Sequence, residues 1–348
     1  IVGSDGNDTI TIVSAETFTY GFFVQGAAGN DLIIGPATPK GSIYADYLNT
    51  AVGSGVSVNL ITGRASDGQG GTDTLSGIAS ARGSALGDTL IGNAGENWFL
   101  PRGGNASIVG GAGIDMVLHV EASSPVSVNL ATRRAQDGEG GIDTLSGIER
   151  IRATGYADTL IGSAANERFS PFSGNDTING AGGIDTIDYS SNVAVSVNLS
   201  IGRASDGLGG FDSFSGIEYV LAGSGNDNLT GSAGNDTLEG AEGDDYLRGL
   251  AGSDLIIGGA GFDTADYSTE ATPITATVTY NGTSGHSATV SSAGGTDTLR
   301  DIEAINGTSG ADYIQATLTD PIAGFQARGY GGNDTIVGTA DRSVGFLA

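Results

Sequence analysis

Five aspartates recur at intervals of nine residues in the second half of the chain, each in a glycine-rich setting. They are Asp227, Asp236, Asp245, Asp254 and Asp263. Two residues after each stands an apolar position: Leu229, Leu238, Leu247, Ile256 and Ala265. A unit of nine residues is too small to form a core, but stacked copies bury their apolar positions against one another. Stacking also aligns the carboxylates, which repel unless a cation lies between them, and we expect that cation to be calcium.

The turns offer backbone carbonyls and one carboxylate each, all of which are hard oxygen ligands. Such ligands select calcium or magnesium over zinc or copper. Six to eight ligands at about 2.3–2.6 Å favour the larger ion. If one coil uses two nonapeptides, aspartates eighteen residues apart face each other across an ion. The expected pairs are Asp227 with Asp245, Asp236 with Asp254, and Asp245 with Asp263.

The elements that must position these carboxylates are short strands and turns. The repeat reads Gly-Gly-x-Gly-x-Asp-x-apolar-x with substitutions, as in residues 240–248. Glycine suits turns that need φ > 0 or a close backbone approach to an ion. The three residues after the turn predict a short strand with its apolar side chain inward. Glycine is too frequent for helices, since each costs about 1 kcal/mol against alanine. We therefore predict an all-β chain.

A longer period of about 70 residues is superimposed on the short one. The pentapeptide Val-Ser-Val-Asn-Leu occurs at residues 56–60, 126–130 and 195–199 and alternates as a strand does. Aspartates follow each copy at fixed offsets: Asp67, Asp137 and Asp206; then Asp73, Asp143 and Asp212; then Asp88, Asp158 and Asp227. A looser fourth copy begins near Ile274 and rejoins the register at Asp297 and Asp312.

These periods divide the chain into five segments. They are a partial unit at 1–55, units at 56–125, 126–194 and 195–268, and a divergent unit at 269–348. The third full unit is longer by about one nonapeptide, because its aspartate series runs from 227 to 263 while the others run from 88 to 115 and from 158 to 185. Addition of whole nonapeptides is what stacking predicts, since an inserted coil leaves the register of its neighbours intact.

The candidate ligands differ in how closely they follow the pattern. The run from Asp227 to Asp263 keeps strict register, whereas Glu167 interrupts the series of Asp158, Asp176 and Asp185. The remaining candidates are Asp88 and Asp115 in the first unit and Asp8, Asp31 and Asp334 near the ends. The first unit reads Asp88, Asn97, Ala106, Asp115, and because Ala106 has no ligand atom in its side chain we expect at least one site there to be lost or weakened.

Several residues have two interpretations. Asp67, Asp137 and Asp206 either add a ligand or bond their own backbone as turn residues. Phe99 and Phe169 fall on the inward position of two altered nonapeptides, which favours a larger core residue over a partner-binding patch that would use Trp98 or Phe172. Tyr189 and Tyr267 each follow a final nonapeptide, which favours a structural tyrosine that closes the stack over a sugar-binding platform.

Composition excludes some classes of function. The chain has 348 residues, of which 61 are glycine, 14 are Lys or Arg and 40 are Asp or Glu, giving a formal net charge of -26. This charge argues against nucleic acid and anionic membranes as partners. There is no cysteine, which removes disulfides and thiolate metal sites. No apolar run is long enough for a membrane span. Because the sequence begins inside a repeat, we expect a fragment or a processed form.

The nonapeptides resemble the RTX, or hemolysin-type, calcium-binding repeat. The resemblance extends from Gly3 to about Asp334 and is strongest between Gly223 and Ser268. It implies a parallel β-roll or β-helix with calcium between successive turns, bacterial type I secretion, and folding outside the cell where calcium is abundant. It carries directly onto Asp227 to Asp263 and poorly onto Asn97 and Ala106. Residues 269–292 depart from the pattern and suggest longer strands without calcium turns.

RTX repeats accompany many activities, so function has to be argued from the chain itself. The two histidines, His119 and His286, lie in no HExxH motif, and no nucleophile elbow frames a serine, so we expect no enzyme here. The first hypothesis is a secreted structural or cell-surface protein, such as an S-layer, fibre or adhesin segment, which self-associates or binds surface components. The second is the calcium-dependent module of a larger secreted enzyme. Ice binding fits less well because the outward residues after each aspartate vary.

Overall fold

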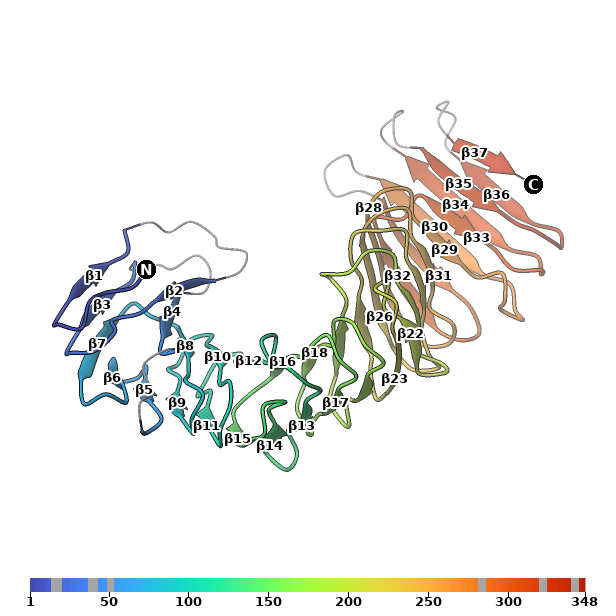
Figure 1. Ribbon diagram of the computed structural model, residues 1–348. Helices are drawn as coiled ribbons and strands as arrows, with labels where there is room; N and C mark the ends of the chain where they lie inside the picture. Colours follow the sequence, from blue (N-terminus) through green and yellow to red (C-terminus); the bar gives the residue numbers. More distant parts are fainter. Residues whose placement is uncertain are drawn as a thin grey trace. The chain divides into compact units, whose positions relative to one another are not determined.

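The computed structural model describes residues 1–13, 21–36, 43–48, 53–280, 286–318, 324–338 and 344–347. The described residues form short β-strands and turns with no helix, as Figure 1 shows, which confirms the all-β prediction. The chain divides into two compact units: Ile1–Pro171 with Ala181–Gly183, and Phe172–Gly180 with Ile184–Ala348. Parts of the predicted segments 1–55 and 269–348 lie outside the described residues.

In each unit the strands form two sheets that are mostly parallel. In unit 1 the first sheet has the spatial order β1 (Thr9–Thr11), β3 (Leu32–Ile34), β7 (Thr72–Ser76), β6 (Arg64–Ser66), β5 (Ser57–Asn59), β9 (Thr89–Ile91), β11 (Ser107–Val109), β15 (Ile142–Ser146), β14 (Arg134–Gln136), β13 (Ser127–Asn129) and β17 (Thr159–Ile161). The second sheet has the order β2 (Phe22–Val24), β4 (Ile43–Asp46), β8 (Ser80–Arg82), β10 (Trp98–Leu100), β12 (Met116–Leu118), β16 (Arg150–Arg152) and β18 (Arg168–Ser170).

Unit 2 has the same architecture. Its first sheet has the order β19 (Thr177–Asn179), β23 (Phe211–Ser215), β22 (Arg203–Ser205), β21 (Ser196–Asn198), β25 (Asn228–Thr230), β27 (Tyr246–Arg248), β29 (Thr264–Asp266), β33 (Ala304–Asn306), β35 (Phe325–Arg328) and β37 (Val344–Leu347). Its second sheet has the order β20 (Thr186–Asp188), β24 (Tyr219–Leu221), β26 (Thr237–Glu242), β28 (Leu255–Ala260), β32 (Thr296–Arg300), β31 (His286–Ser291), β30 (Thr275–Tyr280), β34 (Tyr313–Leu318) and β36 (Thr335–Gly338).

One coil of the roll contains one strand from each sheet. In the regular run Asn228 pairs with Tyr246 in the first sheet, and Thr237 pairs with Leu255 in the second. Each partner is eighteen residues further along, so one coil uses two nonapeptides, as the sequence predicted. The apolar positions Leu229, Leu238, Leu247, Ile256 and Ala265 are all fully buried between the sheets. The fold is a parallel β-roll.

The 70-residue repeat adds an antiparallel meander to this roll. In unit 1 the Val-Ser-Val-Asn-Leu strand β5 pairs antiparallel with β6, which pairs antiparallel with β7. The three strands occupy three adjacent positions in the first sheet, with β5 parallel to β9 and β7 parallel to β3. Strands β13–β15 and β21–β23 form the same arrangement, so each long repeat begins with a meander and continues with single strands.

The extra nonapeptide in the third long repeat changes the sheet in which the next meander lies. Five single strands, β8 to β12, separate β7 from β13, and both meanders of unit 1 lie in the first sheet. Six single strands, β24 to β29, separate β23 from β30, and the meander β30–β31–β32 lies in the second sheet. A nonapeptide is half a coil, so adding one keeps the ladder register but moves the following element to the opposite sheet.

The large inward residues predicted for the altered nonapeptides are in the core. Phe99 in β10 and Phe169 in β18 are fully buried, which confirms the core interpretation. Trp98 faces the other side of its sheet, where it packs against a buried cluster of Tyr44, Leu100, Met116 and Leu118. Whether Trp98 or Phe172 binds a partner stays a prediction.

Candidate metal centre

The aspartates of successive coils are joined by a ladder of hydrogen bonds. The backbone N–H of Asp227 donates to Oδ1 of Asp245 at 2.8 Å, and that of Asp245 donates to Oδ1 of Asp263 at 2.8 Å. The N–H of Asp236 donates to Oδ1 of Asp254 at 2.9 Å. The structure thus brings together the three pairs that the nine-residue spacing predicted.

The same contact positions most of the other candidate ligands. The N–H of Asp8, Asp31, Asp176, Asp254 and Asp312 donates to Oδ1 of Asp31, Asp73, Asp212, Asp297 and Asp334, respectively. Elsewhere the donor belongs to an apolar residue or to Asn97: Val56, Asn97, Ala106, Val126, Val195 and Ile274 donate to Asp88, Asp115, Asp143, Asp158, Asp227 and Asp312. The ladder of N–H to Oδ1 hydrogen bonds therefore continues across coils into which a meander is inserted.

Sequence reasoning missed three glutamates that occupy aspartate positions. Glu149, Glu218 and Glu303 accept, through Oε2, the N–H of Asp115, Asp185 and Asp263 at 2.9, 3.0 and 2.9 Å. Each stands six residues after the second aspartate of a meander, at Asp143, Asp212 and Asp297. That fixed offset was the signal that could have revealed them.

A second ladder runs in the opposite direction through the residue before the aspartate. Oδ1 of Asn226 accepts the N–H of Asp244, and Oδ1 of Asp244 accepts the N–H of Phe262, at 3.0 and 2.8 Å. Asn175 and Asn235 make the same contact with Phe211 and Ser253. A turn that makes both contacts, such as the one containing Asp244 and Asp245, is bonded to the coil before it and to the coil after it.

The second carboxylate oxygen is buried without a hydrogen-bond partner in many of these turns. In the described part of the chain this holds for Oδ2 of Asp31, Asp67, Asp115, Asp137, Asp143, Asp206, Asp227, Asp245, Asp254 and Asp263. These residues are at most 2 % exposed. Burying an ionised carboxylate oxygen without a partner is costly, so such an oxygen indicates a missing cationic ligand or a proton.

Glycine five residues before the aspartate makes room for this oxygen. A Cβ built on Gly240, Gly249 or Gly258 would lie 2.0, 2.3 or 2.4 Å from Oδ2 of Asp245, Asp254 or Asp263. The carboxylate therefore folds over its own turn. The first glycine of the repeat is required by the position of the carboxylate, not only by the backbone conformation of the turn.

Backbone carbonyls reach the same turns from the preceding coil. A Cβ on Gly243, Gly252 or Gly261 would lie 2.2, 2.2 or 1.8 Å from the carbonyl oxygen of Gly225, Gly234 or Gly243. These glycines have left-handed φ values of +126°, +133° and +151°. Each of these turns thus contains both carboxylate and carbonyl oxygens, the hard-oxygen donor types that calcium prefers.

Burial raises the pKa of these carboxyls well above the ordinary value of 3.8. The pKa is about 6 for Asp227 and Asp245 and about 7 for Asp254 and Asp263. The main cause is loss of hydration, and neighbouring carboxylates add to it, such as Asp297 beside Asp254. The raised values mean that the metal-free turns hold a negative charge less readily than exposed carboxyls do, and that they take up a proton near pH 6 to 7.

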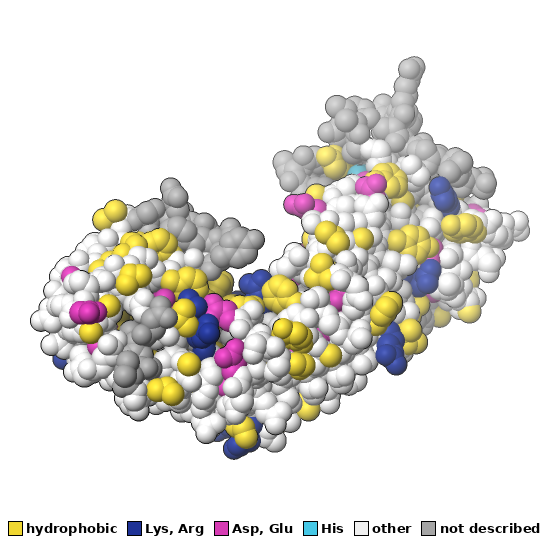
Figure 2. Space-filling view, in the orientation of Figure 1, with side chains coloured by type: hydrophobic (Ala, Val, Ile, Leu, Met, Phe, Trp, Pro, Cys, Tyr) yellow, Lys and Arg dark blue, Asp and Glu magenta, His cyan; other side chains and the backbone are white. Residues whose placement is uncertain are grey.

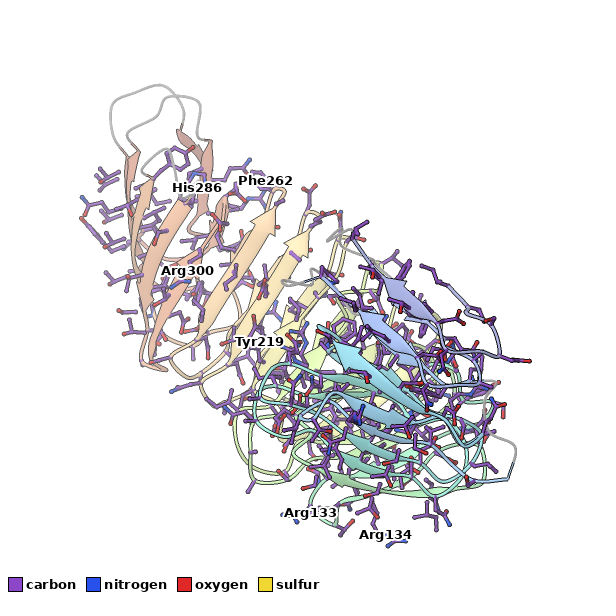
Figure 3. All side chains as sticks on the ribbon, turned by 90° about the vertical axis from the view of Figure 1, so that its left-hand side faces the viewer. Arg133, Arg134, Tyr219, Phe262, His286 and Arg300 are labelled. Atoms are coloured by element: carbon purple, nitrogen blue, oxygen red, sulfur yellow. The ribbon has the colours of Figure 1, made fainter. Side chains whose placement is uncertain are left out.

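Within the described ranges no arginine forms an ion pair with an aspartate of the regular run. Arg82, Arg102, Arg150 and Arg248 pair instead with acidic residues outside the ladder: Asp46, Glu96, Glu121 and Asp266. Figure 3 shows Arg133 and Arg134 at the tip of the β13–β14 hairpin, pointing away from the coils. Few acidic side chains are visible on the face drawn in Figure 2, although the chain has 40 of them, because the turn aspartates lie buried.

Asp67, Asp137 and Asp206 bond their own turns, as one of the two interpretations proposed. Oδ1 of Asp67 accepts the N–H of Gln69 and Gly71 at 2.8 and 2.9 Å. The same bonds recur at Asp137 and Asp206. Their Oδ2 atoms are nevertheless buried and without a hydrogen-bond partner in the described structure, so the ligand interpretation stays open as a prediction.

Three buried tyrosines hold the meander aspartates. The hydroxyls of Tyr47, Tyr189 and Tyr267 donate to Oδ2 of Asp73, Asp212 and Asp297 at 2.9, 2.6 and 2.9 Å. Tyr189 and Tyr267 are therefore interior structural residues, which is what the sequence favoured over a sugar platform.

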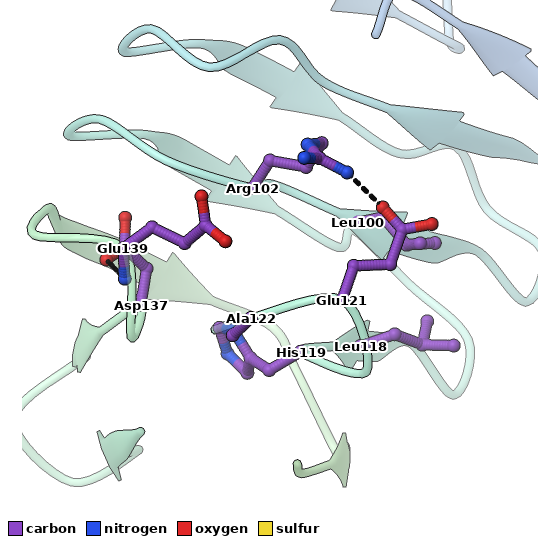
Figure 4. A pocket seen from close by; sticks show the side chains of 8 residues that line it. All are labelled: Leu100, Arg102, Leu118, His119, Glu121, Ala122, Asp137 and Glu139. Atoms are coloured by element: carbon purple, nitrogen blue, oxygen red, sulfur yellow. Dashed lines mark hydrogen bonds and ion pairs between the residues drawn. The ribbon is translucent and has the colours of Figure 1, made fainter. Parts of the chain in front are cut away.

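The second meander replaces this tyrosine with His119. The side chain of His119 is buried beside a small cavity of about 10 Å³ that is also lined by Asp137, as Figure 4 shows. Its Nε2 and Oδ2 of Asp143 have no hydrogen-bond partner within the described residues. Burial lowers the pKa of His119 to about 4, so the imidazole is neutral at pH 7.

In the first long repeat a neutral amide stands where other coils have a carboxylate. Nδ2 of Asn97 donates to the carbonyl of Ala79 at 2.8 Å and to Oδ1 of Asn93 at 3.2 Å. Ala106, in the next turn, is buried and offers no side-chain ligand. These two positions thus bring no carboxylate to their turns, and the loss or weakening of a calcium site there stays a prediction.

No group of three or more His, Cys, Asp or Glu side chains that could hold a metal occurs among the described residues. The oxygen atoms that these turns offer are those of one or two carboxylates and of backbone carbonyls. The fold and its buried carboxylate turns define a β-roll built for hard divalent cations.

Comparison with known families identifies the repeat. The family model for the RTX calcium-binding nonapeptide repeat (4 copies) matches residues 82–117, 143–170, 172–188, 212–247, 230–265 and 327–344. The chain therefore contains RTX nonapeptide repeats, and RTX nonapeptide repeats bind calcium ions. Comparison with curated proteins gave no match. No helix in the described part of the structure could cross a membrane.

Proposed function

We propose that this chain is a secreted protein whose coils close when calcium binds outside the cell. RTX repeats are typical of secreted proteins, and the repeats occur in both units. The observation that carries the proposal is the set of buried Oδ2 atoms without hydrogen-bond partners on Asp245, Asp254 and Asp263, aligned coil after coil. At neutral pH these carboxylates need a cation, and no Lys, Arg or His among the described residues forms an ion pair with them.

The chain's own residues prepare the turns for that ion. The hydrogen-bond ladder fixes Oδ1 of each aspartate and leaves Oδ2 over the turn, where the first glycine makes room for it. Calcium, when bound, supplies the positive charge that lets adjacent coils approach. We propose as ligands the ladder carboxylates that keep an unpartnered oxygen, with Asp227, Asp245 and Asp263 forming the most regular row.

The test is the secondary structure of the protein with and without calcium. Circular dichroism in EGTA should show a largely disordered chain, and millimolar calcium should restore the strand signal cooperatively. Each site should bind weakly, with Kd of about 10⁻⁴–10⁻³ M, as extracellular calcium modules do. An unchanged spectrum in chelator would remove the folding-switch mechanism.

Within this proposal we favour a structural or cell-surface role over an enzymatic one. His119 and His286 are 4 % and 5 % exposed, so the only two imidazoles lie inside the roll and not in an open site. Self-association is the property that distinguishes an assembly protein. Sedimentation velocity in calcium should show oligomers or fibres whose amount increases with protein concentration, whereas a strictly monomeric roll would favour a stabilising module of a larger secreted enzyme.

A further inference from the structure

The residue four positions before the carboxylate divides the turns into two types. In one type this residue is Ser or Thr, and it bonds the carboxylate of its own turn. The N–H of Ser232 donates to Oδ2 of Asp236 at 2.5 Å, and its hydroxyl donates to Oδ1 at 3.2 Å. We call these capped turns. Their carboxylates are Asp8, Asp88, Asp158, Glu167, Asp236 and Asp312.

In the other type the same position has a left-handed backbone. Its φ is +79° at Ala241, +68° at Leu250 and +115° at Gly259, four residues before Asp245, Asp254 and Asp263. We call these open turns. Ala27 and Gly111 place Asp31 and Asp115 in the same type, with φ of +74° and +113°. In all five the Oδ2 atom is buried and has no hydrogen-bond partner among the described residues.

Burial does not explain the difference between the two types. Asp88 and Asp236 in capped turns are as inaccessible as Asp245 and Asp254 in open turns. The two types differ in whether Oδ2 accepts a hydrogen bond from its own turn. A capped turn satisfies it with a backbone N–H of the same turn, whereas an open turn leaves it directed at the space over its first glycine.

The open turns also contain strained backbone. Alanine and leucine avoid the left-handed region, because their Cβ approaches the carbonyl oxygen there at a cost of roughly 1–2 kcal/mol. Seven of the nine non-glycine residues with positive φ in the described chain lie four positions before a turn's ladder residue: Ala27, Arg102, Phe172, Ala181, Ala241, Leu250 and Tyr330. Strain repeated at one position of a repeat marks a functional requirement at that position.

The turn of Asn97 is capped although its side chain is a neutral amide. Its turn has Asn93 in the capping position, and Oδ1 of Asn97 accepts the N–H of Asn93 at 2.7 Å. The amide also donates to the carbonyl of Ala79. A neutral side chain thus completes the turn with hydrogen bonds alone.

We propose that open turns bind calcium and capped turns close without it. This rests on the proposed calcium function and refines it. It assigns ions to the open-turn carboxylates described above, Asp31, Asp115, Asp245, Asp254 and Asp263, and withholds ligand duty from Oδ2 of the capped aspartates. Asp227, whose turn is of neither type, stays a ligand as proposed above. To coordinate an ion through Oδ2, a capped carboxylate has to lose the hydrogen bonds that it accepts from its own turn. In an open turn Oδ2 has no such hydrogen bond to lose. Capped coils are the parts of the roll that form first when calcium is scarce.

The test exchanges the two types by single substitutions and counts the bound ions. Ser232→Gly converts residues 231–236 to Gly-Gly-Ala-Gly-Asn-Asp, so the variant should bind about one more calcium per chain. Leu250→Ser introduces a cap before Asp254 and should lose about one, while the matched control Leu250→Gly keeps the open turn and the wild-type number. Equilibrium dialysis followed by elemental analysis gives these numbers directly.

A second readout follows local structure without calcium. In EGTA, hydrogen exchange of the peptide that contains β28 should be slower in Leu250→Ser than in Leu250→Gly, because the cap replaces the ion. Equal ion numbers and equal exchange in these two variants would overturn the inference. If Leu250→Ser fails to fold, Asp236→Asn against Asp245→Asn decides it: the first should keep the wild-type number of ions and the second should lose at least one. A wild-type chain that binds no calcium would instead refute the proposed function.

Discussion

Asp245 and Asp263 are joined by a hydrogen bond of 2.8 Å from the backbone N–H of the first to Oδ1 of the second, and each keeps a buried Oδ2 without a hydrogen-bond partner in the described structure. One oxygen of each carboxylate is therefore used to hold the coils in register, and the other remains for a ligand. Because Oδ1 joins the coils and Oδ2 of the same carboxylate remains for a cation, stacking and cation binding depend on each other.

Loss of one carboxylate should matter most where both neighbours are carboxylates. Asp245 lies between Asp227 and Asp263 in the ladder, whereas Asp115 has the neutral Asn97 on one side. Asp245→Ala should therefore raise the calcium midpoint of folding more than Asp115→Ala does. Circular dichroism during calcium titration measures both midpoints, and equal values would contradict the pairing of sites through Asp245.

A methyl group on the first glycine of a turn should displace the carboxylate. The Cβ of Gly240→Ala would lie 2.0 Å from Oδ2 of Asp245. We expect a loss of about 1–3 kcal/mol of stability in calcium, as for other overpacked sites. Gly182→Ala is the control, because its Cβ meets no atom within 4 Å. Thermal unfolding in millimolar calcium compares the two, and a wild-type melting temperature for Gly240→Ala would show that the carboxylate position is not fixed.

Acid should replace calcium in part. The pKa of Asp254 and Asp263 rises from 3.8 to about 7 in the folded, metal-free chain, mainly through burial. Between these values the folded state holds protons that the unfolded state has lost, so the free energy of unfolding falls as pH rises. Decalcified protein should therefore show more strand structure at about pH 5 than at about pH 8. Far-ultraviolet circular dichroism across this range tests the sign, and more structure at the higher pH would refute it.

The tyrosine that closes each meander should contribute measurably to stability. Tyr267→Phe removes the hydroxyl that donates to Oδ2 of Asp297 and leaves that buried oxygen without this partner. We expect a loss of roughly 1–3 kcal/mol. Tyr313→Phe is the control, because its hydroxyl makes a longer contact of 3.4 Å with Gln315 at the surface. Chemical denaturation in calcium measures both variants, and equal midpoints would mean that the Tyr267 bond has no net effect.

The repeat unit itself could be predicted from the sequence because its determinants are local. Each nonapeptide contains its own turn, carboxylate and inward residue, so the spacing of Asp227, Asp236 and Asp245 was sufficient to predict strands, burial and pairs eighteen residues apart. The depleted positions at Asn97 and Ala106 could be recognised in the same way, since a missing carboxylate is visible in the sequence.

Tertiary structure alone decided which oxygen atoms remain for a cation. Glu149, Glu218 and Glu303 join the ladder from 33 to 40 residues away, and the tyrosine contacts span 23 to 30 residues. The nine-residue pattern does not record such contacts, because they depend on which coil stacks on which after the meanders are inserted. The number of single strands between meanders, each of which is half a coil, also decided that the last meander lies in the opposite sheet. The sequence therefore determined the unit and its ligand types, while stacking determined how each carboxylate is used.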